Sequence, residues 1–143
     1  MPGGHREEGE NDPQVTAARE FEEETFISRK HLQFKGYLPF TVTNRKTVIA
    51  SAVFKFTESM DYFSRQLSEN KEWSDAFLVN IAELLEPHSW SYARRIDQTQ
   101  KRALFFRELT PSEIIRLRGD EQRYLLWGAT AKIIWSLLAH YEY

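Results

Sequence analysis

The feature that most constrains this chain is a run of acids near its N-terminus, in which four of five consecutive residues are glutamates: Glu20, Glu22, Glu23 and Glu24. Asp12 suits the N-cap of a helix and Pro13 its first position, so residues 13 to 25 are predicted to form one helix. At about 100° per residue, Glu20, Glu23 and Glu24 fall within an arc of roughly 100°, and Glu22 falls well outside it.

Three carboxylates on one helix face repel one another by amounts similar to those that stabilise an i,i+4 ion pair. Such a face is either an acidic, solvated surface or a place that holds a cation. Carboxylate oxygens select Mg²⁺, Mn²⁺ or Ca²⁺, and Mg²⁺ is the usual partner when substrate phosphates complete the shell. Arg19 lies four residues before Glu23, close enough to neutralise and orient it. The glutamate face is therefore a candidate site for a divalent metal.

A longer pattern surrounds these glutamates. Gly4 is followed by five residues and Glu10, and eight residues later the chain reads REFEEETFI from Arg19 to Ile27. The stretch resembles the Nudix box, the signature of hydrolases of nucleoside diphosphates linked to another moiety. Its pattern is Gly, five residues, Glu, seven residues, then Arg-Glu-apolar-x-Glu-Glu-x-Gly-apolar.

Two positions depart from the box, and neither removes a metal ligand. One extra residue separates the first glutamate from the arginine, and we place it in the turn around Asn11 and Asp12. Phe26 stands where the family has glycine. Because that glycine would end the helix with a positive φ, we expect a different end geometry at Phe26.

The resemblance implies an α/β fold, a Nudix-type α/β/α sandwich with a mixed sheet between the box helix and C-terminal helices. We expect a single Nudix-like domain over residues 1–143, with the box loop and helix at 3–27, strands at about 33–79 and a C-terminal helical part at about 80–143. In that family, strands of the sheet precede the box, whereas here the match begins almost at residue 1. We therefore expect an N-terminally truncated sheet.

The resemblance also implies roles for individual residues. The catalytic candidates are Glu23, Glu24 and Arg19. The candidates for holding Mg²⁺ (or Mn²⁺) are the side chains of Glu20, Glu23 and Glu24 and the backbone carbonyl of Gly4. Glu10 and Gly3 are expected to organise the loop. Some members use a further acid from a later loop as a base or ligand, and four acids stay open for that role: Glu69, Glu72, Asp75 and Glu121.

Beyond the box, strand and helix signals alternate. Residues 33–40 and 46–56 are rich in β-branched and aromatic residues, which predicts a hairpin or two neighbouring strands. The second strand is predicted to be central and covered by helices on both faces. Residues 58–71 are predicted to be a loop with room for one helical turn, and 72–79 a strand that leads to a short helix capped by Asn80. Thr110-Pro111-Ser112-Glu113 is a capping box that predicts a helix closed by Gly119. The apolar spacing after Gly128 predicts a long terminal helix.

Composition excludes several other classes of protein. With 143 residues, 41% hydrophobic and 28% charged, the chain suits one soluble globular domain. A net charge of −2 argues against a generally polyanion-binding surface. The absence of cysteine excludes disulfides and thiolate sites and fits a reducing compartment, so we expect a cytoplasmic protein. No apolar run approaches the roughly 20 residues of a membrane span. The four histidines lack the spacing of a zinc site.

The residues that bind the substrate are not fixed by the sequence. Aromatic side chains that could stack on a base include Tyr37, Phe40, Trp73 and Trp90, and Arg94 could meet a phosphate. Residues 88–107 mix basic and aromatic side chains, which suits either a polyphosphate or RNA backbone or a solvated face whose long side chains cover the core. The substrate thus stays open among ADP-ribose, a dinucleoside polyphosphate, a coenzyme A-like molecule, a nucleoside triphosphate and a capped RNA.

Three functions follow as hypotheses. The first is a Mg²⁺-dependent hydrolase of a small nucleotide derivative. The second is an mRNA-decapping Nudix hydrolase, for which RNA is a partner. The third is a truncated, non-catalytic protein that binds nucleotides. The oligomeric state is left open by the sequence.

Overall fold

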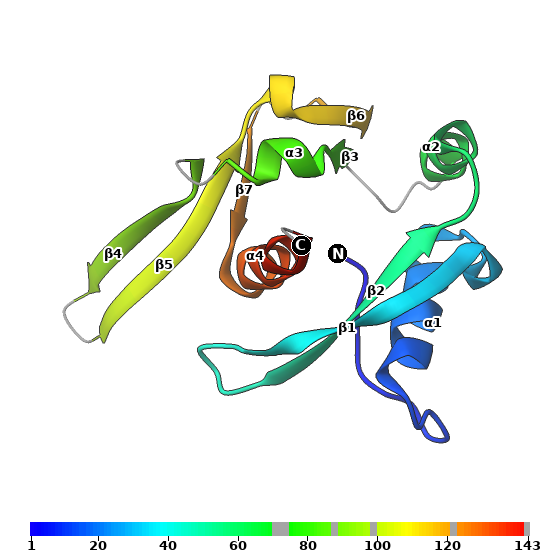
Figure 1. Cartoon of the computed structure of the whole chain (residues 1–143), viewed down its shortest axis with the longest axis horizontal. Coiled ribbons are helices and arrows are strands. Elements are labelled where there is room, and N and C mark those ends of the chain that lie inside the picture. Colours follow the sequence, from blue (N-terminus) through cyan, green and yellow to red (C-terminus); the bar gives the residue numbers. More distant parts are fainter. Residues whose placement is uncertain (70–74, 87–88, 98–99, 121–122, 142–143) are drawn as a thin grey trace.

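The box helix organises the N-terminal half of the computed structural model, which describes residues 1–69, 75–86, 89–97, 100–120 and 123–141 (Figure 1). For residues 92–97 and 100–104 it describes the backbone alone. Helix α1 spans Pro13–Thr25, as predicted, with Pro13 in its first turn. Asp12 is the N-cap, and its carboxylate accepts a hydrogen bond from the Gln14 amide at 3.2 Å. Helix α1 thus begins where the cap signals placed it.

The other end of α1 differs from our expectation. Phe26 has φ 59° and ψ 16°, the left-handed conformation that glycine would adopt, and its amide donates to the Glu22 carbonyl. The prediction of a different end geometry was therefore wrong. The chain must turn here because the next residue, Ile27, is fully buried. A side chain in this conformation costs about 1–2 kcal/mol, which the burial that follows must offset.

A β-hairpin follows, after a short 3₁₀ turn η1 at Arg29–His31. Strand β1 (Leu32–Val42) pairs antiparallel with β2 (Val48–Phe56), which confirms the predicted hairpin. Strand β2 contacts α1 and β1 contacts α4 (Gly128–Tyr141), so the hairpin connects the two helices (Figure 1). Among the described strands β2 pairs with β1 alone, so its predicted central position was wrong. Helix contacts, not further strands, account for its apolar composition.

Residues 58–71 were predicted to be a loop, but α2 occupies Met60–Glu69. Ser59 starts this helix, since its hydroxyl accepts from the Tyr62 amide at 3.2 Å. The scattered aromatic residues are its packing face: Phe63 meets Phe56 of β2 at a ring distance of 5.1 Å, and Leu67 is buried. The packing of that face fixes a helix whose sequence period was weak.

The C-terminal half was predicted to be helical and instead contains strands. Strand β3 (Ala76–Val79) leads to α3 (Ile81–Leu84), which Asn80 caps as predicted. Strands β4 (Ser91–Asp97), β5 (Gln100–Leu109) and β7 (Tyr124–Trp127) form one sheet, and β3 pairs with β6 (Ile114–Arg118). Every pair of described strands is antiparallel, so the predicted mixed sheet was also wrong. The arrangement of helices on antiparallel strands keeps the α/β class.

The capping box at Thr110 exists but does not begin a long helix. The Glu113 carboxylate accepts from the Thr110 amide at 2.8 Å, and residues Pro111–Glu113 form a single 3₁₀ turn, η3. Two β-branched residues follow, Ile114 and Ile115, and they pair with β3 in strand β6. Strand pairing therefore overrides the local helix signal.

The predicted terminal helix is confirmed as α4. Its buried residues include Ala131 and Leu138, which join Leu84, Trp90 and Leu109 in the core of the C-terminal half. Trp90 stacks on Phe105 at 4.9 Å and donates its indole N–H to the Leu84 carbonyl. In the part of the chain that the structure describes, no helix has the length and apolar character needed to cross a bilayer.

The left-handed end of α1 generates a stability prediction. Phe26 is 60% exposed, so two variants that both lack its ring isolate the backbone effect. We expect Phe26→Gly to be more stable than Phe26→Ala by about 1 kcal/mol, because alanine retains the strain of a positive φ. Urea unfolding of both variants measures this difference. Equal midpoints would show that the chain leaves α1 by another geometry.

Candidate metal site of the N-terminal loop and first helix

The N-terminal loop runs back along the glutamate face of α1. The Gly3 amide donates to Glu24 Oε1 at 3.3 Å, and the His5 carbonyl accepts from Arg19 Nη2 at 3.0 Å. A Cβ at Gly4 would lie 2.3 Å from Glu20 Oε1, so any side chain there would push that carboxylate aside. At Gly4, the lack of a side chain therefore lets the backbone approach the acids closely.

Arg19 is the residue that joins the acids of this face. Its Nε lies 2.8 Å from Glu10 Oε1, its Nη2 2.9 Å from Glu20 Oε1 and its Nη1 2.7 Å from Glu23 Oε2. The rigid, planar guanidinium holds N–H donors of three nitrogens in fixed directions, whereas lysine offers its donors from a single nitrogen. The bond to Glu10 is the largest of the effects that raise the pKa of Arg19. Arg19 thus neutralises and orients carboxylates that would otherwise repel one another.

Glu10 anchors the loop to the helix. Besides the bond to Arg19, its carboxylate accepts from the Thr16 hydroxyl at 2.7 Å and from the Glu7 amide at 2.9 Å. These bonds, chiefly the one to Arg19, lower the pKa of Glu10 from 4.5 to about 2. All of its described partners are groups of the loop and helix. This arrangement supports the structural role predicted for Glu10.

The glutamates divide as helical spacing predicted. Glu22 points to a different part of the molecule, where Oε2 lies 3.3 Å from Arg29 Nε and Oε1 accepts from the Arg29 amide at 3.1 Å. Glu20 and Glu23 share Arg19, and Glu24 meets the Gly3 amide. Glu22 is thereby separated from the candidate ligands.

The donor set fits a hard divalent cation. The side chains of Glu20, Glu23 and Glu24 supply carboxylate oxygens. Gly4, where an added Cβ would lie 2.3 Å from Glu20 Oε1, can supply a carbonyl oxygen. Within the described ranges, no three acidic or histidine side chains are already gathered in a metal shell. The fit therefore rests on the chemistry of the donors and on the close approach at Gly4.

Only some of the residues predicted to bind the substrate lie near the box. Tyr37 lies beside the box: its hydroxyl donates to Asp12 and accepts from the Gln14 amide. Trp90 is buried in the C-terminal core and presents no open face for a base. The side chains of Trp73 and Arg94 lie outside the described residues.

The later acids show no described contact with the box. Asp75 accepts from the Tyr124 hydroxyl at 2.9 Å, and Glu69 is exposed at the end of α2. Glu72 and Glu121 lie outside the described residues. None of the four is therefore distinguished as a base or further ligand.

Sequence reasoning missed Thr16, whose buried hydroxyl binds Glu10. It also missed that Tyr37 holds the start of the helix. The available signal for Thr16 was a threonine near the start of a helix that is rich in acids. The role of Tyr37 could not be found before the hairpin was known to fold against α1.

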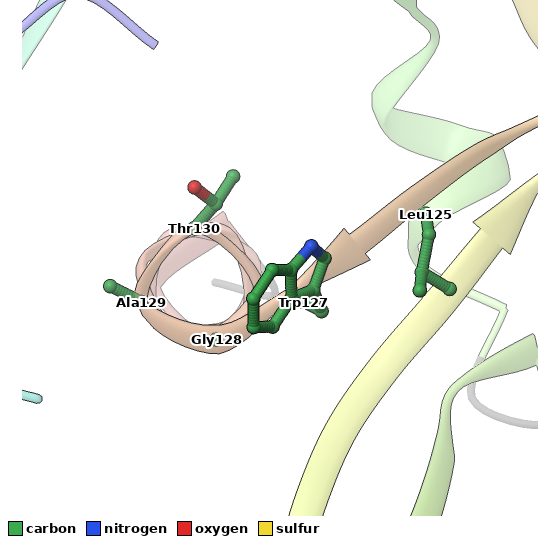
Figure 2. Close-up of a pocket in the computed structure, with 5 residues that line it drawn as sticks. All are labelled: Leu125, Trp127, Gly128, Ala129 and Thr130. Carbon is green, nitrogen blue, oxygen red and sulfur yellow. The ribbon is translucent and has the colours of Figure 1, made fainter. Parts of the chain in front are cut away.

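A separate pocket of about 340 Å³ lies where β7 meets α4 (Figure 2). Five residues line it: Leu125, Trp127, Gly128, Ala129 and Thr130. None of these side chains is an acid, a base or a metal ligand of the predicted kind. The pocket therefore contributes nothing to the candidate metal site.

The lowered pKa of Glu10 generates a prediction for pH dependence. A carboxyl whose pKa is depressed in the folded state stabilises the fold above its unfolded pKa, near 4.5, and this stabilisation is lost as the pH falls toward about 2. We expect Glu10→Gln to be less stable than the parent at pH 6, by a margin that shrinks between pH 4.5 and 2. Urea unfolding across that range measures it. Glu8→Gln, an exposed acid of the same loop, is the control, and a constant margin would contradict the assignment.

One of the comparisons with known proteins gives a match. A family model for the NUDIX domain matches residues 1–100, which cover the loop, α1, the hairpin and the strands up to the start of β5. No curated protein and no solved structure matches the chain. The match and the arrangement of the box together place the chain in the Nudix family, whose enzymes are pyrophosphohydrolases of nucleoside diphosphate derivatives.

Proposed function

We propose that this protein is a Mg²⁺-dependent hydrolase that cleaves the pyrophosphate bond of a small nucleotide derivative, a nucleoside diphosphate linked to another moiety such as ADP-ribose. One observation carries the proposal. Arg19 joins Glu10, Glu20 and Glu23 in a single network, and the glycine loop lies against the same face. A merely solvated acidic face would need neither the arginine at its centre nor a loop held along it.

The residues that would hold Mg²⁺ are Glu20, Glu23, Glu24 and the carbonyl of Gly4. Bound there, the ion would shield phosphate charge and acidify a water for attack on phosphorus. Arg19 orients Glu23 by binding Oε2, while the Glu23 side chain stays 56% exposed. Glu23 is thus held in position and open to substrate. Arg19 acts through the carboxylates, as a residue that positions them.

The residues that motivated the decapping hypothesis give it no support. Trp90 and Arg107 are both buried, and Arg107 is paired with Glu113 at 2.6 Å. The side chains of 92–104 lie outside the described residues. RNA as a partner, a cytoplasmic location and a single domain over residues 1–143 stay predictions. The alternative of a non-catalytic protein that binds nucleotides is tested by the same assay as the leading proposal.

We expect Glu23→Gln and Glu24→Gln each to lower kcat by about 100-fold or more, because each removes a charged oxygen donor from the metal site. Folding stability should change by only about 0.5 kcal/mol, since these are surface positions. The assay is release of nucleoside monophosphate from ADP-ribose and related diphosphates in Mg²⁺.

The matched control is Glu22→Gln, the same change on the same helix at a position that faces Arg29. The kcat of this variant should stay within about twofold of that of the parent protein. Loss of the exposed ion pair with Arg29 should change only the free energy of unfolding. Equal losses of activity in Glu22→Gln and Glu23→Gln would show that the glutamate face is not the catalytic site. An inactive parent protein would favour the non-catalytic alternative.

Removal of the metal gives a further prediction. EDTA should abolish hydrolysis, and added Mg²⁺ or Mn²⁺ should restore it, because the carboxylates cannot by themselves shield phosphate charge. Mn²⁺ binding followed by electron paramagnetic resonance gives a readout independent of turnover. Glu20→Gln should weaken this binding, whereas Glu22→Gln should not. Activity that survives complete chelation would overturn the metal assignment.

A further inference from the structure

We propose that the exposed faces of Phe34 and Tyr37, on strand β1 beside the start of α1, form the subsite that holds the nucleobase of the substrate. This inference rests on the proposed function and adds a place for the base to it. It follows from three features of the hairpin: an irregularity in its pairing, the exposure of two rings, and the attachment of one ring to the box helix.

The irregularity brings the two rings to one face. Phe34 pairs with Phe54 and Gly36 with Val53, so Lys35 is an extra residue in β1. Residues three apart in a regular strand point to opposite faces. The bulge at Lys35 cancels one alternation, and the rings of Phe34 and Tyr37 meet with centroids 4.9 Å apart and planes at 59°. Such bulges often re-aim a side chain next to an active site.

Both rings keep an open surface. Phe34 is 37% and Tyr37 46% exposed. On its covered side, Phe34 meets Phe54 at a centroid distance of 5.7 Å. The pair is therefore supported from the sheet and accessible from outside. An exposed aromatic face of this kind is the surface on which nucleobases stack, whatever their identity.

Tyr37 is fixed to the helix that carries the catalytic glutamates. Its hydroxyl donates to Asp12, the N-cap of α1, and accepts from the Gln14 amide at 3.3 Å. Glu20 to Glu24 follow Asp12 by eight to twelve residues, or about 12–18 Å along the helix. Helical side chains lean toward the N-terminus, so the Glu20 carboxylate is the nearest of these acids to the rings. A nucleotide with its base on the rings would place its diphosphate at the Glu20 end of the glutamate face. Because the ring is held in place, little ordering is needed when a base binds.

Phe40 lies on the same strand, but its ring differs from those of Phe34 and Tyr37 in exposure and in contacts. It is 72% exposed, more than either ring of the pair. No described hydrogen bond or ring contact links it to α1 or to the pair. Phe40 therefore serves as the matched control for an exposed aromatic of β1.

The experiment compares AMP with ribose 5-phosphate, which is the same ligand without its base. AMP has no pyrophosphate bond, so it binds without being cleaved by the proposed reaction. Titration calorimetry with both ligands in Mg²⁺ should show AMP binding about 5- to 100-fold more tightly to the parent protein. Replacing adenine by uracil should reduce this advantage without abolishing it.

Four variants test the rings. Tyr37→Leu and Phe34→Leu should each reduce the advantage of AMP at least threefold and leave ribose 5-phosphate unchanged. Tyr37→Phe keeps the ring and should retain most of the advantage. Phe40→Leu should behave as the parent protein.

The outcomes separate this inference from the proposed function. An unchanged AMP advantage in Tyr37→Leu and Phe34→Leu, equal weakening of both ligands, or no AMP advantage in the parent protein would each overturn the base subsite. Hydrolysis of ADP-ribose would then still stand by its own assay. Conversely, a parent protein that binds AMP through these rings but cleaves no pyrophosphate would keep the subsite and refute the proposed hydrolase.

Discussion

The structure of the box depends on one half-buried cation, Arg19, among several acids. Without Arg19, Glu10, Glu20 and Glu23 would repel one another across a narrow space between loop and helix. With Arg19 in place, the loop is attached to α1 through Glu10, and the carboxylates of Glu20 and Glu23 on the same helix are held beside it. A planar guanidinium is suited to this because it can bind three carboxylates in fixed directions. The same interaction therefore supports both the local fold and the arrangement of the candidate metal ligands.

The ends of α1 show how the surrounding structure holds that helix in place. At its start, Asp12 caps the helix and is in turn held by Tyr37 from the hairpin. At its end, Phe26 adopts a left-handed conformation because the chain must deliver Ile27 to a fully buried position. Burial of an apolar side chain contributes about 1.5–3 kcal/mol, enough to offset a cost of about 1–2 kcal/mol for the strained residue before it. The extra residue of the box and the missing glycine are thus accommodated without moving the glutamates off their face.

Predictions from the sequence were accurate where residues close together in the chain fix the structure. The N-cap, the first-turn proline and the 3.6-residue period placed α1 and separated Glu22 from the other glutamates. It failed where a local signal was overridden by packing. The capping box at Thr110 closes only one turn, because Ile114 and Ile115 pair with β3. Strands β4 and β5 were missed because the basic and aromatic composition of residues 88–107 was interpreted through its charge instead of its strand propensity.

The sequence by itself determined the family, the position of the box helix, the face on which its glutamates lie and the arginine that can pair with them. All of these depend on residues close together in the chain, where spacing fixes geometry. Only the tertiary structure decided that the glycine loop lies along α1, that Tyr37 holds the N-cap and that Phe34 and Tyr37 share a face. These features depend on contacts between distant segments and on one unpaired residue in a strand. A single extra residue reverses the side on which every later side chain of a strand points, and a strand pattern cannot reveal such a change before its partner is known.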